Sequence, residues 1–365
     1  MLEEGKIAEF KPVVVSNRPK RPYWIKPVLV FFVTAILAVG GYFGYQYYLK
    51  NAAKKMFKAE SVGIINDQNI AFATISKDQK SLLFLDQIDN TLRELKIDFP
   101  DKPSEKIATL DFTPNLTEIT NVKWAADNWQ KFYIFVNIPG SSQIYYWDMT
   151  SVDAGDYRAV DKKIVDIDFG GERAFYIYNS ESERSINTGN LDGTSWRNLT
   201  TIGTQYYNIL SSPDYKRVAV WGMAAEPGQK NIAIFDTPTN EFREIDDGLI
   251  NFARFSPDSS RLLYSKTVDG NSKLFMVESN GGIKDLNSEV YFDLFSWRGN
   301  NDIVYVGYNA KVKTYDFYTM SMADKKKKVI NRAEGELTDP KILIITSDGK
   351  NLFYTNNSEL FKLAL

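Results

Sequence analysis

The stretch FSPDSSRLLYSK (residues 255–266) joins a Ser-Pro-Asp turn to a short apolar strand. Two similar stretches, SSPDYKRVAVWG (211–222) and ITSDGKNLFYTN (345–356), occur elsewhere in the chain. A type I turn favours Ser, Pro and Asp in this order, because proline presets φ and the flanking side chains bond to the turn backbone. Each stretch therefore predicts the end of one strand and the start of its antiparallel neighbour.

The apolar runs that follow such turns recur at a nearly constant interval. They end at or near Asp86, Asp148, Asn190, Asp236, Glu278, Met320 and Ala364, so the successive intervals are 62, 42, 46, 42, 42 and 44 residues. Five of the six match the period of four-stranded propeller blades, and no segment after residue 61 keeps a helical apolar period. Such sheets bury their faces only by stacking around an axis. The sequence predicts an all-β fold, a β-propeller of about seven four-stranded blades over residues 61–365.

Two features of the repeat stay open. Residues 61–76 can begin the first blade, with Asn66, Asp67 and Gln68 in place of the Ser-Pro-Asp turn. Residues 57–65 are also available as a fourth strand that closes the ring on the last blade. The first interval is longer than the blade period, and its extra length is assigned to residues 99–118, as a loop or as an extra strand pair.

The pattern resembles the TolB-type propeller, a bacterial relative of the WD repeat. The matching pairs are SSPDYKRVAVWG with NIAIFDTPTNEFREI, FSPDSSRLLYSK with KLFMVESNGGIKDL, and TSDGKNLFYTN with ELFKLAL, and LDGTSWRNLT is similar to the family's outer-strand ending. The turns in FSWRGNNDIVYV and DFGGERAFYIY lack Pro-Asp and depart from the pattern. The resemblance implies the fold and no particular function, and it supplies no membrane anchor, so a role in the TolB complex is not carried over.

Residues 27–49 contain 23 consecutive uncharged residues, enough for one transmembrane helix. A cleaved signal peptide is the alternative, but no clear cleavage motif follows and tyrosines gather at the end, as in an interfacial belt. We expect a cytoplasmic basic tail (1–26), a transmembrane helix (27–49), a charged stalk (50–60) and an extracytoplasmic propeller (61–365) in a bacterial cytoplasmic membrane. Gly40 and Gly44 form a small-residue face that suits a homodimer.

Charge is divided unequally along the chain. Residues 1–58 carry ten basic and three acidic residues (net +7), leaving 34 basic and 43 acidic residues (net −9) in the remainder. The basic N-terminal segment suits anionic lipid headgroups, whereas the acidic remainder of the chain argues against a nucleic-acid partner.

The chain has no cysteine and no histidine, which excludes disulfides, Cys or His metal sites and imidazole-based triads. There is no G-x-S-x-G motif, and we expect no cofactor, no metal and no catalytic residue. The alternative is a glycosidase or sialidase-like enzyme that uses central carboxylates, for which the sequence offers Asp166, Asp168, Glu172, Glu181, Glu183, Asp246 and Asp247. Most tryptophans are expected to pack between blades.

The loops between second and third strands form the candidate binding rim. They are polar and of variable length, which suits a protein or glycan partner in the cell envelope. The candidate residues are Ser141, Gln143, Glu181, Arg184, Glu226, Lys230, Asp269 and Asn271. The function predicted from sequence is a membrane-anchored binding or assembly scaffold.

Overall fold

A computed structural model describes residues 60–61, 70–76, 78–86, 88–97, 103–110, 118–125, 128–138, 141–150, 157–180, 182–222, 228–309, 313–330, 337, 340–356 and 359–365. The chain divides into two compact units, Met1–Lys55 and Met56–Leu365. The expected tail, the transmembrane helix and nearly all of the stalk lie outside the described residues. Within the described ranges, no helix has the length and hydropathy needed to cross a bilayer.

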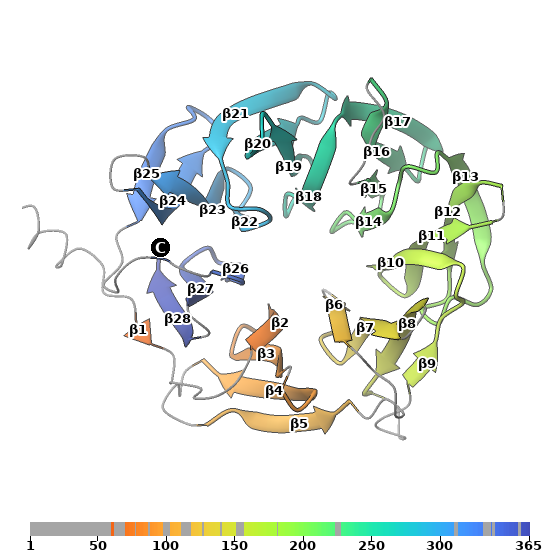
Figure 1. Cartoon of the computed structure of the whole chain (residues 1–365), viewed down its shortest axis with the longest axis horizontal. Helices are drawn as coiled ribbons and strands as arrows, with labels where there is room; N and C mark the ends of the chain where they lie inside the picture. The colour runs from red at the N-terminus through yellow and green to blue at the C-terminus, as the bar shows by residue number, and fades with distance from the viewer. Residues whose placement is uncertain are drawn as a thin grey trace, which may run out of the picture. The chain divides into compact units, whose positions relative to one another are not determined.

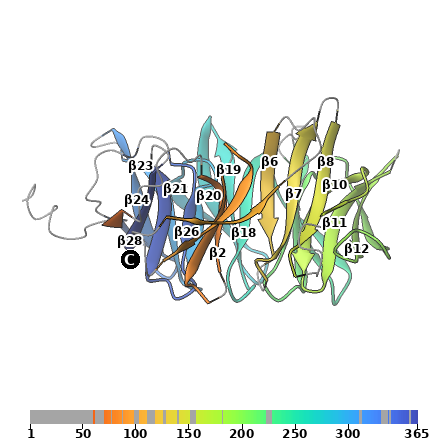
Figure 2. The same cartoon turned by 90° about the horizontal axis from the view of Figure 1, so that it is seen from below.

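Seven four-stranded antiparallel sheets form a closed ring in the second unit (Figure 1), and their strands run between the two faces of that ring (Figure 2). The sheets are blade 1 with β2 (Ile70–Ile75), β3 (Ser81–Asp86), β4 (Thr91–Lys96) and β5 (Glu105–Thr109); blade 2 with β6 (Glu118–Trp124), β7 (Lys131–Ile138), β8 (Ser141–Asp148) and β9 (Tyr157–Ala159); blade 3 with β10 (Ile164–Gly170), β11 (Arg173–Asn179), β12 (Arg184–Gly189) and β13 (Arg197–Ile202); blade 4 with β14 (Asn208–Ser211), β15 (Arg217–Trp221), β16 (Lys230–Asp236) and β17 (Glu241–Asp247); blade 5 with β18 (Leu249–Phe255), β19 (Leu262–Val268), β20 (Asn271–Val277) and β21 (Ile283–Glu289); blade 6 with β22 (Phe295–Arg298), β23 (Asp302–Asn309), β24 (Thr314–Ser321) and β25 (Lys327–Ile330); and blade 7 with β26 (Leu343–Ile345), β27 (Asn351–Asn356), β28 (Glu359–Ala364) and β1 (Glu60–Ser61). The predicted seven-bladed β-propeller is confirmed.

The ring is closed by a strand from the start of the second unit. β1 pairs with β28, with Glu60 opposite Lys362 and Ser61 opposite Phe361. Blade 7 therefore takes its outer strand from residues 60–61, and blade 1 begins with its own inner strand, β2. This answers the question that the sequence left open.

Two details of the predicted repeat are wrong. Asp86 ends β3, which is the second strand of blade 1, whereas Asp148 ends the third strand of blade 2. The long first interval therefore reflects a misaligned strand as well as a longer connection. The stretch 99–118 contains β5, the outer strand of blade 1, and adds no extra blade.

The same turn chemistry recurs in blades 1, 4, 5 and 7. In blade 5, the amide of Ser259 donates to the carbonyl of Ser256 at 2.8 Å, and Ser259 adopts a left-handed conformation with φ of 61°. The hydroxyl of Ser256 donates to Asp258 at 2.6 Å and accepts a bond from the amide of Arg261 at 3.0 Å. Equivalent bonds join Ser76 to Asp78, Ser212 to Asp214 and Thr346 to Asp348. The first blade thus has its turn at Ser76, where the sequence continues Lys-Asp in place of Pro-Asp.

Apolar side chains fill the spaces between adjacent blades. One cluster joins blade 7 to blade 1 through Phe353, Leu360, Leu82 and Phe84, and comparable clusters occupy the other seams. This packing is what four-stranded sheets require, because a single blade leaves both of its faces uncovered. Trp147, Trp221 and Trp297 are buried in these seams, as predicted, whereas Trp196 is 66% exposed.

Candidate functional site

The two faces of the ring carry different connections. Because neighbouring strands are antiparallel, the turns between first and second strands and between third and fourth strands gather on one face, here called the turn face. The connections between second and third strands, and those that lead from one blade to the next, gather on the opposite face, here called the rim face. The predicted binding residues belong to the rim face. Glu181 and Glu226 lie outside the described residues.

Two of the predicted rim residues support the fold. Gln143 is buried, and its side-chain amide donates to the carbonyls of Ile144 and Val160 at 2.9 and 2.7 Å. Arg184 is also buried and donates to the carbonyl of Tyr206 at 2.8 Å, while its guanidinium lies 3.8 Å from the centre of the Tyr207 ring. Both polar side chains are buried because they tie a strand to the next connection, and their role in binding stays a prediction.

The other described rim residues remain candidates for binding. Ser141 and Asn271 are exposed at the start of third strands, and Lys230 is half-buried at the start of β16. Asp269 and Gly270 both have positive φ, of 52° and 80°, as a two-residue type I′ hairpin requires. Their role in binding stays a prediction.

A charged cluster joins blades 4 and 5 on the rim face. The ammonium of Lys266 lies 3.1 Å from Asp246 and 3.0 Å from Asp247, and the hydroxyl of Tyr264 donates to Asp246 at 2.7 Å. Burial, with the hydrogen bond to Asp246, raises the pKa of Tyr264 well above its ordinary value. The Lys266 ammonium holds the pKa of Asp247 below its usual range. Asp246 thus has a cation and a hydroxyl as partners and orders this part of the rim.

Exposed aromatic side chains lie on the rim face of blade 6. Phe292 is 64% exposed and Tyr308 is 46% exposed. The rings of Phe292, Tyr291, Tyr315 and Tyr308 form a continuous series, with successive centroid distances of 4.9, 4.7 and 5.6 Å. Phe292 has a φ of 49°, a conformation that is strained for a bulky residue. An exposed phenylalanine in a strained conformation contributes little to the stability of the fold. This aromatic series is therefore a candidate contact surface.

The same face carries most of the exposed apolar side chains of the described residues. Ile88, Tyr207 and Leu249 lie on its connections or strand ends, together with Phe292 and Tyr308. The remaining large exposed apolar residues, Trp196, Ile283 and Val329, lie on or beside outer strands.

Carboxylates on an inner strand are engaged in links between blades. Asp166 on β10 accepts bonds from the ammonium of Lys123 on β6 and from the amide of Ile209, at 2.8 and 2.7 Å. Asp168 accepts bonds from the amide and the hydroxyl of Ser211 at 2.7 and 3.0 Å. Burial raises the pKa of both carboxyl groups above the ordinary value. These two groups fasten blade 3 to its neighbours.

The described residues hold no group of three or more Asp, Glu, His or Cys side chains placed to bind a metal ion. The carboxylates suggested by the sequence at Asp246 and Asp247 share Lys266 as a partner and belong to the rim cluster. Glu172 is on the turn face, between β10 and β11.

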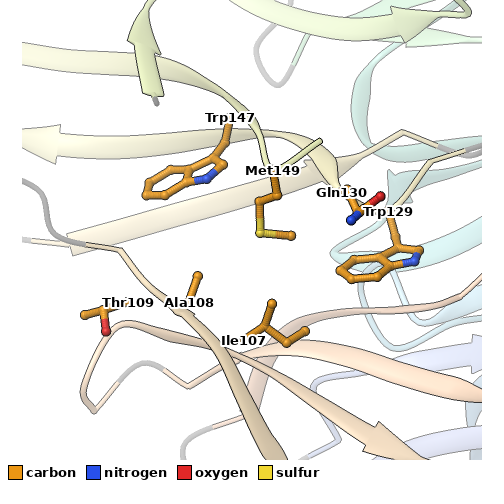
Figure 3. A pocket seen from close by; sticks show the side chains of 7 residues that line it. All are labelled: Ile107, Ala108, Thr109, Trp129, Gln130, Trp147 and Met149. Atoms are coloured by element: carbon orange, nitrogen blue, oxygen red, sulfur yellow. The ribbon is translucent and has the colours of Figure 1, made fainter. Parts of the chain in front are cut away.

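A pocket of about 310 Å³ lies at the seam between blades 1 and 2 (Figure 3). Its lining comes from β5, from the turn before β7 and from the end of β8. The lining residues are Ile107, Ala108, Thr109, Trp129, Gln130, Trp147 and Met149. In Figure 3, Trp147 and Met149 project from one side, Ile107 and Ala108 from another, and the indole of Trp129 lies apart from both pairs. The pocket combines apolar walls with one amide and one hydroxyl, a composition typical of small-ligand sites.

Sequence reasoning missed both the blade 6 aromatic series and this pocket. The four aromatic residues of the series are scattered in sequence between residues 291 and 315 and meet only because blade 6 folds back on itself. The sequence identifies Trp129 and Trp147 as aromatic, but nothing in it shows that β5 of the preceding blade completes a pocket with them.

Comparisons with known proteins support the fold. No family model matches the chain, and no curated protein matches it. Among solved structures, a chain of the mitotic checkpoint complex is 14% identical, with a TM-score of 0.57 over 84% of this chain and 92% of that one. An oligogalacturonate lyase in complex with manganese is 11% identical, with a TM-score of 0.55 over 85% of this chain and 96% of that one.

TolB from Acinetobacter baumannii is also similar, at 14% identity and a TM-score of 0.46, over 74% of this chain. The match spans 65% of the length of that TolB. Identities this low carry information about fold and not about activity. The fold defines the class: the chain is a seven-bladed β-propeller protein.

Proposed function

We propose that the chain is a single-pass membrane protein that presents its propeller outside a bacterial cytoplasmic membrane, as a scaffold that binds a partner through the rim face. The observation that carries this proposal is the concentration of exposed apolar side chains on that face, above all Phe292 and Tyr308. Exposed apolar patches rimmed by polar groups are typical of contact surfaces between proteins. The rigid ring fixes the relative positions of these side chains, which lowers the entropic cost of binding.

The direction of β1 shows at which face the chain enters the ring. As the outer strand of blade 7, β1 runs toward the rim face, so Glu60 lies at its turn-face end. The exposed apolar side chains of the rim face therefore lie on the face opposite to this point of entry.

A glycosidase-like activity gains no support from the carboxylates that were considered for it. Asp166 and Asp168 are occupied by Lys123, Ser211 and backbone amides. A hydrolase needs one carboxyl group facing a water or a sugar across an open cleft. The oligogalacturonate lyase shares the fold at 11% identity, and at this identity no catalytic role is transferred from its residues to those of this chain.

Site-directed photocrosslinking in cells tests the proposed contact surface. A photoreactive phenylalanine analogue is introduced into the full chain at Phe292 or Tyr308, and, as matched controls, at the exposed apolar positions Ile283 and Val329 on outer strands. We expect irradiation to give a discrete cross-linked species from the first pair alone. The same species from all four positions, or none from any of them, would contradict the proposal.

A further inference from the structure

We propose that the pocket between blades 1 and 2 binds one ring of a neutral saccharide. This inference extends the proposed scaffold role by naming a ligand class, but the pocket is separate from the aromatic series on blade 6. The lining contains no ionisable side chain among its seven residues. A volume of about 310 Å³ accommodates a single pyranose ring.

The two tryptophans of the pocket have different surroundings. One face of the Trp147 indole stacks on Phe132, with centroids 5.9 Å apart and planes 9° from parallel, and Tyr157 lies 5.5 Å away at 26°. Trp129 has no ring contact with any described aromatic residue and is half-buried. An indole face carries partial negative charge, and the C–H groups of a sugar face carry partial positive charge. Trp129 therefore supplies the stacking surface, while Trp147 forms a fixed wall.

The polar groups of the pocket distinguish a sugar from an apolar side chain. The side chains of Gln130 and Thr109 make no hydrogen bond to any described residue. The backbone of Gln130 is held in place, because its amide donates to Asn128 at 3.0 Å and its carbonyl accepts a bond from the amide of Met149 at 2.9 Å. A bound apolar side chain would remove these polar groups from water without offering partners, which is unfavourable. Sugar hydroxyls both donate and accept, so they match an amide and a threonine hydroxyl.

The seven described lining residues carry no charge, and this selects among sugars. A uronic acid or a phosphorylated sugar would lose hydration of its charge on entering the pocket, with no cation among those seven side chains to compensate. The structure therefore favours hexoses and N-acetylhexosamines over acidic sugars.

Binding is measured with the full chain in detergent micelles, by the change in tryptophan emission and by saturation-transfer NMR. The probes are methyl β-D-glucopyranoside, N-acetyl-D-glucosamine and D-glucuronate. We expect saturable binding of at least one neutral probe, with a dissociation constant on the order of 1 mM for so small a ligand. Trp129→Ala should weaken it at least tenfold and Gln130→Ala about fivefold.

Trp196→Ala provides the matched control, because Trp196 is 66% exposed on blade 3 and its loss should leave sugar affinity unchanged. Thermal melts of each variant confirm that the propeller is intact. The proposal is overturned if no neutral probe saturates, if Trp129→Ala binds like the unmodified chain, or if glucuronate binds more tightly than the neutral sugars. The blade 6 crosslinking result is independent of all three outcomes, so the two proposals fail separately.

Discussion

Lys123 and Asp166 form an ion pair between the inner strands of blades 2 and 3, with the ammonium nitrogen 2.8 Å from both carboxylate oxygens. The same ammonium donates to the carbonyl of Ile209 on blade 4 at 3.0 Å. One lysine side chain thus connects three consecutive blades. The pair is only slightly exposed, so it is weakly screened by solvent.

Lys123→Met should destabilise the propeller by about 3 kcal/mol, because it leaves the carboxylate of Asp166 buried without its cation. Urea denaturation of the full chain in detergent measures the change. Lys326→Met is the control, since the Lys326–Asp324 pair is exposed and its loss should have no measurable effect. A Lys123→Met chain as stable as the unmodified one would show that the ion pair does not hold the blades together.

The buried carboxyl group of Asp168 predicts a specific pH dependence. Its pKa is raised in the folded state by burial, so between the unfolded pKa of about 3.9 and the raised value the folded state holds more protons than the unfolded state. The contribution of Asp168 to the free energy of unfolding therefore falls as the pH rises through this window. Asp168→Asn removes the titrating group, so the difference in stability between the unmodified chain and the variant should fall over the same window. A difference that is constant, or that grows with pH, would contradict this assignment.

The Ser-Pro-Asp turn predicts a stability effect at Ser256. Its buried hydroxyl is bonded to Asp258 and to the amide of Arg261. Ser256→Ala should cost about 1–2 kcal/mol, since the amide of Arg261 and the carboxylate of Asp258 lose this partner. Ser279→Ala, at an exposed position of the same blade, should change stability little. Equal melting temperatures for the two variants would exclude the turn as a stabilising unit.

Closure of the ring predicts the effect of shortening the chain. A chain that begins at residue 62 lacks β1, so blade 7 keeps three strands and β28 becomes an open edge. A chain that begins at Met56 retains the pair. We expect the shorter chain to melt at a lower temperature and to aggregate at lower protein concentration, as followed by light scattering. Indistinguishable melting and scattering curves would mean that β1 does not close the ring.

Much of the fold was predictable because local signals repeat. The Ser-Pro-Asp turns before Arg217 and Arg261 mark the start of a second strand in blades 4 and 5, and turn residues specify backbone conformation locally. Blade 1 departs from the repeat because Ser76-Lys77-Asp78 lacks the proline. Its second strand, β3, is buried along its whole length, so its sequence resembles that of a third strand. Because β3 ends in an acidic residue, Asp86, the sequence pattern assigns this strand to the third position of the blade, whereas it is the second strand.

The candidate sites depend on contacts between distant residues, and sequence patterns do not report these. Arg184 and Gln143 are polar residues in predicted loops, yet both are buried because neighbouring backbone carbonyls accept their hydrogen bonds. Phe292 looks like a core residue by type, but its position on a connection between blades leaves it exposed. Composition identifies which side chains can bind, and the fold decides which of them are free to do so.

Cysteine labelling provides the most direct test of a membrane-anchored propeller outside the cytoplasmic membrane, because the sequence contains no cysteine. Two single-cysteine variants of the full chain, Phe292→Cys and Ser16→Cys, are treated with a membrane-impermeant maleimide in spheroplasts, before and after lysis. We expect the chain in the membrane fraction, with Cys at position 292 labelled before lysis and Cys at position 16 labelled only afterwards. Labelling of position 16 before lysis, of position 292 only after it, or recovery of the chain outside the membrane fraction would contradict the account.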